Sequence, residues 1–368
     1  MYIYELEKWP QFTWDSEKIA PLLIQLRHSQ GLLIGGMESI GFSSKEEVIL
    51  QTLTQDVVKS SEIEGEILDQ SLVRSSVARQ LGIDDAAVGA VDRNIDGVVE
   101  MMIDATQRFD EPLTQERLFA WHSSLFPTGR SGFKKLKVGS WRSSRVEVIS
   151  GPLGKEKIHF EGPPPARVDR DMDQFLDWIN QDKKMDLVLK AAIAHLWFVT
   201  IHPFEDGNGR IGRAIADLLL ARSENSSRRF YSLSSQIQIE RKGYYQILEQ
   251  TQKGGLNITS WIEWFLSCLA RAIENASKVL ESIKHKERVW KGYADIALNE
   301  RQRKIMNRLL DGFEGKLTTS KWAKIAKCSQ DTAYRDILDL VDRGILIKNQ
   351  EGGRSTSYWL VDPTKKSP

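Results

Sequence analysis

The sequence lacks the features that mark secreted, disulfide-rich and membrane-spanning proteins. Its 368 residues include only two cysteines, Cys268 and Cys328, which lie in separate segments and offer neither a disulfide framework nor a metal-ligand spacing. The first residues, MYIYE, are acidic and aromatic, unlike the basic and then apolar start of a signal peptide. The most apolar helical stretch, near residues 214–221, is too short to cross a bilayer. We therefore expect a cytoplasmic protein without membrane contacts.

The sequence also lacks an excess of one charge. Its 51 lysines and arginines balance 50 aspartates and glutamates, and this net charge of +1 argues against a chain that coats nucleic acid or membrane with its whole surface. The phosphate-binding pattern GxxxxGK[ST] does not occur, which excludes a P-loop site. The length predicts two or three domains.

Apolar residues at three- and four-residue spacing predict that most of the chain is helical. In the first helix, Ile19 and Leu22 begin an apolar face and Gly31 is expected to end it. Gly82 is expected to end a later helix, and Ser260 to cap the last one of this region. The predicted helices cover residues 15–31, 44–60, 67–81, 87–108, 115–126, 167–181, 187–201, 209–222, 242–253 and 259–285.

One region departs from the helical pattern and predicts a β-hairpin. Two short β-like runs, residues 146–149 and 157–160, flank the turn sequence SGPLG at 150–154, and the sequence GPPP at 162–165 ends the second run. A lone hairpin is only marginally stable as a fold element. We therefore expect it to act as a lid or as an edge for docking.

The C-terminal segment has the element order of a winged helix-turn-helix domain. Helices are predicted over residues 300–310, 320–327 and 331–344, followed by strands at 345–348 and 356–360. The third of these helices carries more acidic than basic residues, and the wing adds few cations, so binding to the phosphates of duplex DNA would be disfavoured. The residues are Asp331, Asp336, Asp339 and Asp342 against Arg335 and Arg343 in the helix, with Lys348 and Arg354 in the wing. DNA binding and a protein-interaction or dimerisation role both stay open.

The chemistry of the chain is concentrated in the segment HPFEDGNGR, residues 202–210. Glycines on both sides of Asn208 allow backbone N–H groups to converge on an anion at the start of a helix, and Arg210 and Arg213 project from the first turn of that helix. Asp206 is an oxygen ligand suited to Mg²⁺ beside phosphates, and His202 can accept a proton near neutral pH. Together these groups predict a phosphoryl-transfer site. The alternative is a structural connection with a core histidine and surface arginines.

The segment resembles the signature HPFxDGNGR of Fic-domain proteins, and Gly212-Arg213 continues the likeness. The N-terminal sequences WPQF, residues 9–12, and SSEIEGE, residues 60–66, resemble bacterial Fic proteins that end in a winged helix. The resemblance implies a Fic helical core with a hairpin flap that transfers AMP from ATP to a Ser, Thr or Tyr hydroxyl of a protein. It implies that His202 is the general base, Asp206 the Mg²⁺ ligand and Phe204 the anchor of the loop. The implied ATP and phosphate contacts are Gly207, Asn208, Gly209, Arg210, Ile211, Gly212 and Arg213.

Ser60 and Glu64 stand four residues apart, followed by Gly65, and fit the inhibitory pattern [ST]xxxE[GN] of this family. A carboxylate can replace phosphate oxygens in a guanidinium fork, so the resemblance implies that Glu64 occupies Arg213. The alternative from the residues alone is a capping box, in which Ser61 and Glu64 satisfy the start of the following helix.

The resemblance also implies the groups around the substrates. The hairpin residues Ile158, His159 and Phe160 are implied to dock the target by strand addition. The residues that border the adenine are implied to be Tyr244, Tyr245 and Gln252, although filling the core is the alternative for either tyrosine.

We divide the chain into an inhibitory helical region at 1–100, a Fic catalytic domain at 101–275, a linker helix at 276–295 and a winged-helix domain at 296–368. The expected activity is autoinhibited protein adenylylation with ATP and Mg²⁺, on a protein target or on the chain itself, with a homodimer as one assembly. Two alternatives stay open: removal of AMP with the help of Glu64, and a DNA-binding regulator that senses nucleotide.

Overall fold

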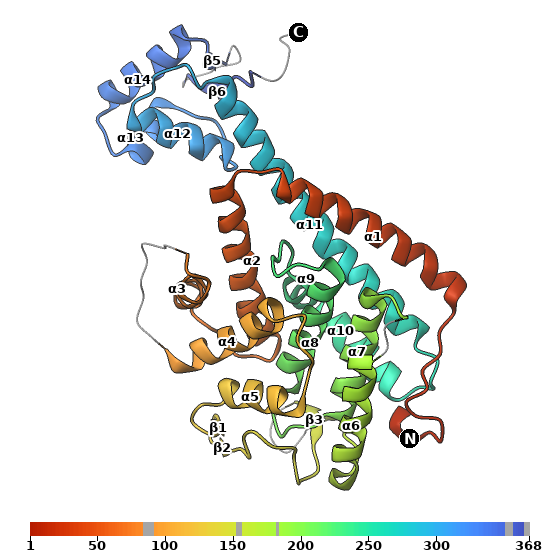
Figure 1. Cartoon of the computed structure of the whole chain (residues 1–368). Helices are drawn as coiled ribbons and strands as arrows, with labels where there is room; N and C mark the ends of the chain where they lie inside the picture. Colours follow the sequence, from red (N-terminus) through yellow and green to blue (C-terminus); the bar gives the residue numbers. More distant parts are fainter. Residues whose placement is uncertain (84–91, 152–156, 182–183, 350–355, 364–368) are drawn as a thin grey trace. The chain divides into compact units, whose positions relative to one another are not determined.

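The computed structural model describes residues 1–83, 92–151, 157–181, 184–349 and 356–363 (Figure 1). Its contacts divide the chain into two units, residues 1–277 and 278–368. The described residues are mainly helical, as the sequence predicts.

The first unit is built around two helices, α7 (Leu187–Ile201) and α8 (Asn208–Glu224). The α7 helix is apolar on all sides, and every residue from Val188 to Ile201 is buried, as expected for a helix at the centre of a domain. The two helices approach closely at Gly212, where an added Cβ would lie 2.9 Å from Val199 Cγ1. Since the loop 202–207 joins these two helices, it is held at both ends by the core.

The other helices of this unit surround α7 and α8 and bring the N-terminal region to the start of α8. The α2 helix packs against α9, α3, α4 and α8, while α6 packs against α7 and α5 packs against α4 and α8. The bounds are α1 (Ser16–Glu38), α2 (Phe42–Ile63), α3 (Gln70–Leu81), α4 (Arg93–Gln107), α5 (Gln115–Leu125), α6 (Pro165–Gln181), α9 (Leu233–Ile239), α10 (Arg241–Gln252) and α11 (Thr259–Gly292), whose last residues belong to the second unit.

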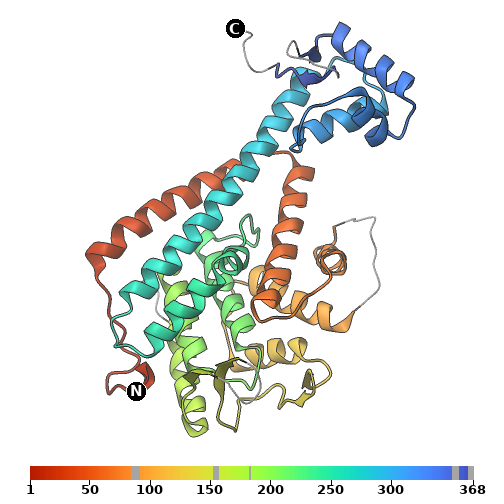
Figure 2. The ribbon, with the colours of Figure 1, turned by 180° about the vertical axis from the view of Figure 1, so that it is seen from behind.

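The N-terminal segment is tied to the segment that precedes α11. After a short 3₁₀ helix, η1 (Ile3–Glu5), Thr13 forms a parallel bridge with Asn257, and α1 and the first part of α11 lie side by side beyond this bridge (Figure 2). Trp9 and Phe12 pack edge-on against Trp197 of α7. The WPQF sequence thus joins the N-terminus to the central helix.

The predicted hairpin is present as β3 (Glu147–Ser150) and β4 (Lys157–Glu161), antiparallel strands with Val148 opposite Phe160 and an irregular register after Val148. Most of its turn, residues 152–156, lies outside the described residues. A second, smaller pair was not predicted: β1 (Arg130–Ser131) and β2 (Lys134–Lys135).

Several helix bounds differ from the sequence prediction for identifiable reasons. The prediction that Gly31 ends α1 was wrong, because the helix continues through Gly31 to Glu38. Ser260 is not the cap of α11, since the helix already begins at Thr259. The α3 helix begins at Gln70 because Asp69 caps it, and Gly82 ends it with φ 68° as expected. The α4 helix begins after Asp92, and residues 87–91 of its predicted start are not described.

The second unit contains the end of α11, then α12 (Glu300–Leu310), α13 (Thr319–Ala326), α14 (Gln330–Asp342) and the antiparallel strands β5 (Leu346–Lys348) and β6 (Tyr358–Leu360). Leu317 adds a bridge to Tyr358 at the edge of this pair. The core gathers around Trp322, with Ile337 and Leu340 of α14. This is the predicted order of elements, and the assignment as a winged helix stays a prediction. The wing residue Arg354 lies outside the described residues.

Two of the four acidic residues on α14 are bonded to other side chains of the second unit. Asp336 is 6% exposed and accepts from both Nε and Nη2 of Arg301, at 2.7 and 3.0 Å. Asp339 accepts from Gln302 Nε2 at 2.7 Å and pairs with Arg343. Arg343 is taken up by the same pairing, which leaves Asp331 and Asp342 against Arg335, so α14 still carries more acidic than basic side chains.

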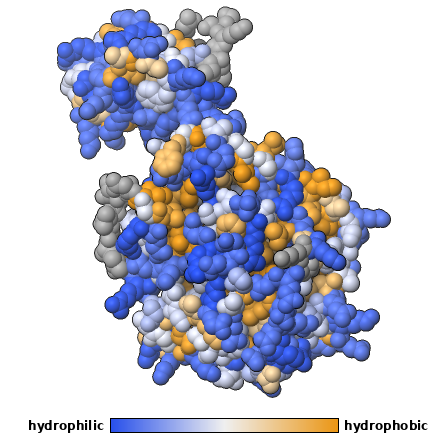
Figure 3. Space-filling view, viewed as in Figure 1, coloured by the Kyte–Doolittle hydropathy of each residue, from blue (hydrophilic) through white to orange (hydrophobic). Residues whose placement is uncertain are grey.

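No described helix has the length and apolarity needed to cross a membrane. The face drawn in Figure 3 is mostly hydrophilic, with hydrophobic side chains in scattered groups.

Two glycine substitutions test the packing. An added Cβ at Gly97 in α4 would lie 1.8 Å from the Ser124 carbonyl oxygen of α5, so Gly97→Ala is expected to lower the free energy of unfolding by about 3 kcal/mol. The control is Gly31→Ala in α1, where no atom lies within 4 Å and alanine is expected to stabilise by about 0.5–1 kcal/mol. Denaturant unfolding measures both, and equal effects would contradict the packing described here.

Candidate active site

His202 stands where α7 ends, in the left-handed conformation with φ 52°. Its backbone N–H closes the last turn of α7 on the Phe198 carbonyl, and its ring Nδ1 lies 3.2 Å from the Val199 carbonyl oxygen. Because a carbonyl only accepts, this contact places the ring hydrogen on Nδ1 and leaves Nε2 to accept a proton. Burial lowers the pKa of His202 to about 4, so the ring is neutral at pH 7.

The loop after His202 is closed by the side chain of Asn208. Asn208 Oδ1 accepts from the Phe204 N–H at 2.9 Å, and Asn208 Nδ2 donates to the Phe204 carbonyl at 2.9 Å. Phe204 is fully buried and stacks on His122 with ring centroids 4.2 Å apart. Since the amide of Asn208 is used within the loop, this residue offers a ligand its backbone N–H.

A concave anion site follows at the start of α8. Gly207 has φ 81°, and the first N–H groups of α8 have no acceptor within the helix, which makes this end favourable for negative charge. The carboxylate of Glu64 already lies there: a Cβ added to Gly209 would be 2.0 Å from Glu64 Oε1. Glycine at 209 is therefore what permits an anion to approach this backbone.

Arg213 is almost completely buried and is bound by the end of α2. Its Nη2 lies 2.8 Å from Glu64 Oε1 and donates to the Ser60 carbonyl at 2.8 Å, while Nε donates to Ser60 Oγ at 2.9 Å. The contact predicted between Glu64 and Arg213 is therefore present, with Ser60 as a second partner.

Arg210 has its own carboxylate, which the sequence analysis missed. Arg210 Nη1 lies 2.7 Å from Glu66 Oε2, and the guanidinium lies over the Phe126 ring at 5.1 Å. Gly65, with φ 87°, lies between Glu64 and Glu66. Arg210 in the first turn of α8 and Arg213 in the second are thus both paired with carboxylates from one short segment.

The capping-box alternative for Glu64 is wrong. Glu64 is the C-terminal cap of α2, and its N–H donates to the Ser61 carbonyl. The next helix begins only at Gln70, where Asp69 accepts from the first N–H groups. Ser61 and Glu64 therefore end one helix and do not begin another.

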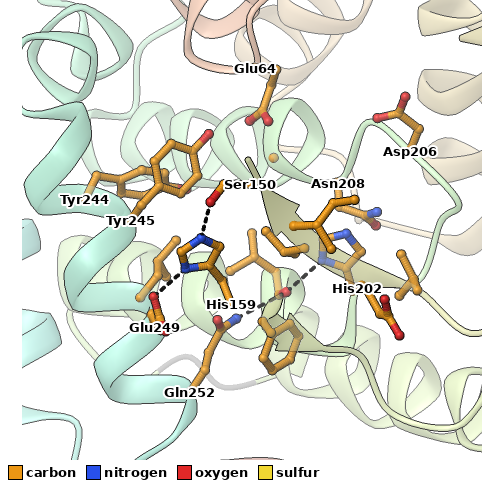
Figure 4. Close-up of a pocket in the computed structure, with 18 of the residues that line it drawn as sticks. Glu64, Ser150, His159, His202, Asp206, Asn208, Tyr244, Tyr245, Glu249 and Gln252 are labelled. Atoms are coloured by element: carbon orange, nitrogen blue, oxygen red, sulfur yellow. Dashed lines mark hydrogen bonds and ion pairs between the residues drawn. The ribbon is translucent and has the colours of Figure 1, made fainter. Parts of the chain in front are cut away.

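The hairpin is bound to α10 through His159. His159 Nδ1 lies 2.6 Å from Glu249 Oε2, and His159 Nε2 lies 2.6 Å from Ser150 Oγ. Figure 4 shows this chain of contacts on the opposite side of the cavity from His202. Hydrogen bonds from Lys253 and His159 lower the pKa of Glu249 to about 2. Phe160 packs against the rings of Tyr2 and Tyr4 near the N-terminus.

The three residues expected at the adenine lie on α10. The Tyr244 hydroxyl lies 2.8 Å from His195 Nε2, and Tyr244 is 2% exposed. Tyr245 donates to the Ile63 carbonyl at 3.1 Å, which ties α10 to the end of α2. Gln252 Nε2 donates to Thr200 Oγ1 at 3.3 Å.

These groups surround a cavity of about 780 Å³, a size typical of small-molecule sites. The predicted site residues that line it are Glu64, His159, Phe160, His202, Asp206, Gly207, Asn208, Gly209, Tyr244, Tyr245 and Gln252. The other predicted residues do not line the cavity. Ser60 and Arg213 are bonded to each other and Arg210 to Glu66, Gly212 lies in the contact between α8 and α7, and Ile211 is fully buried. Ile158 is 46% exposed on the hairpin.

A metal ion at this site would have one carboxylate from the protein. Asp206 lines the cavity, and its Oδ1 accepts from the Gly207 N–H at 2.6 Å. The described residues contain no group of three or more His, Cys, Asp or Glu side chains that could hold a metal alone. A single carboxylate fits Mg²⁺ that is shared with phosphates, since Mg²⁺ keeps several waters and uses few protein ligands.

Comparison with known proteins identifies the middle of the chain. Residues 112–220 match the Fic/DOC family, and residues 2–83 match a domain of unknown function (DUF4172). The chain is 31% identical over 110 residues to a probable protein adenylyltransferase of Aquifex aeolicus (30% of this chain, 31% of the relative). It is 24% identical over 235 residues to the protein adenylyltransferase Fic of Nematostella vectensis (62% of this chain, 50% of the relative). The chain thus spans about a third to a half of these relatives.

Two solved structures share the fold. A Fic family protein from Desulfovibrio desulfuricans has a TM-score of 0.53 at 20% identity and covers 95% of this chain and 98% of its own. A Fic domain containing signaling protein from Bacteroides thetaiotaomicron also has a TM-score of 0.53 at 20% identity, over 71% of this chain and 97% of its own. The helical core with its central loop therefore has the Fic fold. Residues 112–220 of the chain are a Fic/DOC domain.

Because buried histidines of the core are neutral, we expect the free energy of unfolding to fall at acidic pH. Burial lowers the pKa of His122 to about 4, below the value near 6.5 of an unfolded chain. Unfolding therefore takes up a proton below pH 6.5, and stability is lost as the pH falls from 6.5 toward 4. His122→Gln is expected to reduce the slope of unfolding free energy against pH by about 1.4 kcal/mol per pH unit. Urea unfolding measures it, with the exposed His28→Gln as control. An unchanged slope in the His122 variant would contradict the assignment.

Proposed function

We propose that the chain is a protein adenylyltransferase that moves AMP from ATP to a Ser, Thr or Tyr hydroxyl of a protein, the chain itself included. The observation that carries the proposal is that His202 and the anion site at Gly207–Gly209 border one cavity. The names of the relatives, protein adenylyltransferases, support the same chemistry.

In this reaction His202 Nε2 accepts the proton of the target hydroxyl. The hydroxyl oxygen attacks the α-phosphorus of ATP, a new P–O bond forms, and the bond to the leaving pyrophosphate breaks. The neutral ring and the Nδ1 contact with Val199 leave Nε2 in the form that this step needs. The first N–H groups of α8 would hold phosphate oxygens, and Arg210 and Arg213 would bind the rest of the triphosphate.

The groups around this centre suit the remaining parts of the substrates. Asp206 would hold Mg²⁺, which neutralises phosphate charge when bound. Tyr245 and Gln252 border the space proposed for the adenine. The β3–β4 edge, with Ile158 exposed, would pair with the backbone of the target.

We infer that the described state is autoinhibited. Glu64 lies over the backbone of Gly209 and binds Arg213, so a triphosphate cannot use these groups while it stays there. Glu66 holds Arg210 in the same way and adds a second point of contact. The same segment thus blocks both cations that the reaction needs.

Labelled ATP tests the reaction. With α-labelled ATP and Mg²⁺, the Glu64→Gly chain is expected to label itself or a lysate protein, and γ-labelled ATP is expected to give no label. His202→Ala in this background should lower the rate by roughly 10²–10⁴, the range for loss of a general base. Label from the γ-phosphate would mean kinase chemistry and would overturn the proposal. Release of AMP from modified protein, dependent on Glu64, would instead mean that the chain removes AMP.

The two glutamates are expected to contribute unequally. Glu64→Gly should raise labelling roughly tenfold or more, because a charge-assisted contact to a buried guanidinium is worth about 2 kcal/mol. Glu66→Gln should add roughly two- to fivefold on top, because Glu66 is more exposed. The matched control is Glu47→Gln, which breaks the ion pair with Arg74 between α2 and α3. An equal gain in the control would mean that loosening of α2, rather than release of the arginines, raises activity.

A further inference from the structure

Arg142 is a buried arginine that the proposed reaction does not use. It precedes β3 and is only 3% exposed. Its guanidinium donates to backbone carbonyls throughout: Nε to His202 at 2.7 Å, Nη1 to Ser144 at 2.8 Å, and Nη2 to Pro163 at 2.6 Å and to Ile201 at 3.4 Å.

These four carbonyls belong to two different parts of the site. Ile201 and His202 are the last residues of α7 and the start of the loop, where carbonyl groups have no partner within the helix. Ser144 and Pro163 stand just outside the two strands of the hairpin, before β3 and after β4. The backbone N–H of Arg142 adds a further bond, to the Pro203 carbonyl at 2.9 Å. One side chain therefore joins the base of the hairpin to the backbone of His202.

The contribution of Arg142 to stability does not by itself explain why a cation is buried here. The Arg142 guanidinium bonds only to carbonyls among the described residues, and burial lowers its pKa to about 10. A buried cation without an anionic partner costs free energy, and only part of that cost is offset by the dipole at the end of α7. An apolar side chain could fill the same space but could not join four carbonyls.

Close packing allows little freedom around this contact. A Cβ added to Gly162, the residue after β4, would lie 2.7 Å from Val146 Cγ1, 3.0 Å from Arg142 Nη2 and 3.5 Å from His202 Cβ. The Gly162 N–H also donates to the Val146 carbonyl at 3.0 Å. Gly162, at the end of the hairpin, is thus packed closely against both the Arg142 guanidinium and the His202 side chain.

We propose that Arg142 is a positioning residue that fixes the position of the His202 ring relative to the base of the hairpin. This inference rests on the proposed function, in which the hairpin presents the hydroxyl and His202 accepts its proton. A shift of either part by about 1 Å would separate the hydroxyl from the base, and such misplacement lowers rates by roughly a hundredfold. The Nδ1 contact of His202 with Val199 depends on the same backbone, so Arg142 also sets which ring nitrogen is free.

Three variants of the full chain with Glu64→Gly separate positioning from folding. Arg142→Met removes all four bonds, Arg142→Lys keeps the charge and can reach one or two carbonyls, and Arg145→Met is an exposed arginine of the same segment as control. Label transfer from α-labelled ATP gives kcat and the KM for ATP. Nitrogen-15 NMR of the six histidines, with His202 assigned by His202→Asn, reports which ring nitrogen carries the hydrogen.

The expected result is a loss of roughly a hundredfold in kcat for Arg142→Met, with the KM for ATP within about threefold of the parent. Arg142→Lys should recover part of kcat, and Arg145→Met should match the parent. His202 should lose its single Nδ1–H form in Arg142→Met and keep it in Arg145→Met.

Two results would overturn the inference: an unchanged kcat with an unchanged His202 spectrum, or an equal loss of kcat, ATP affinity and melting temperature that lysine does not recover. If the Glu64→Gly parent itself transfers no label, the proposed function fails. The NMR comparison still decides whether Arg142 positions His202.

Discussion

The ion pair between Glu64 and Arg213 is the contact on which the arrangement of the site depends. Arg213 is 1% exposed on its side chain, and a guanidinium at that depth needs an anionic partner. The anion site at Gly207–Gly209 has the same need, since the start of α8 favours negative charge. Glu64 satisfies both in the described state. A triphosphate would satisfy both as well, so under the proposed function carboxylate and phosphate would compete for one electrostatic site.

The outcome of this proposed competition would depend on how firmly α2 is held. Asp56, fully buried in this helix, accepts from Ser232 Oγ, and burial next to Asp217 raises its pKa well above the usual range. Arg229, also buried, pairs with Asp217 of α8. These contacts, with the packing of α2 against α8 and α9, fix the body of the helix. The Glu64 side chain, by contrast, is 32% exposed, and Gly65 follows with a positive φ. The Glu64 side chain is therefore less confined than the body of the helix, although the backbone just before it is bonded to Tyr245 and Arg213.

The sequence predicts the elements that depend on a local residue pattern. It does not predict contacts between side chains that are far apart in the chain and are brought together only by the fold. The α7 helix and the loop at 202–210 follow from an apolar run and from glycine spacing, and the hairpin follows from its turn and proline signals. The pair of Glu64 with Arg213 was expected because a family pattern connects them. Glu66, Arg142 and His122 carry no such pattern: each acts through a partner 60 or more residues away or through a stacked ring, and only the fold brings these together. Gly31 shows the opposite error, since glycine in a helix is a weak stop when the flanking residues are packed.

Arg210 and Arg213 of α8 differ from Arg142 in the kind of partner that each guanidinium contacts. Arg210 and Arg213 are paired with carboxylates that a phosphate could replace, so their partners can exchange during a reaction. Arg142 is paired with carbonyls that no ligand can replace, since the carbonyls belong to the backbone of the site itself. The two arginines whose partners can be exchanged are thus on α8, where the nucleotide would bind. Arg142, whose partners are fixed, contacts the backbone of His202. A site built in this way can release Glu64 and Glu66 without losing the geometry of the base. Under the proposed function, substitution of Glu64 or Glu66 would therefore free Arg210 and Arg213 for the triphosphate and leave the contacts of Arg142 with the His202 backbone unchanged.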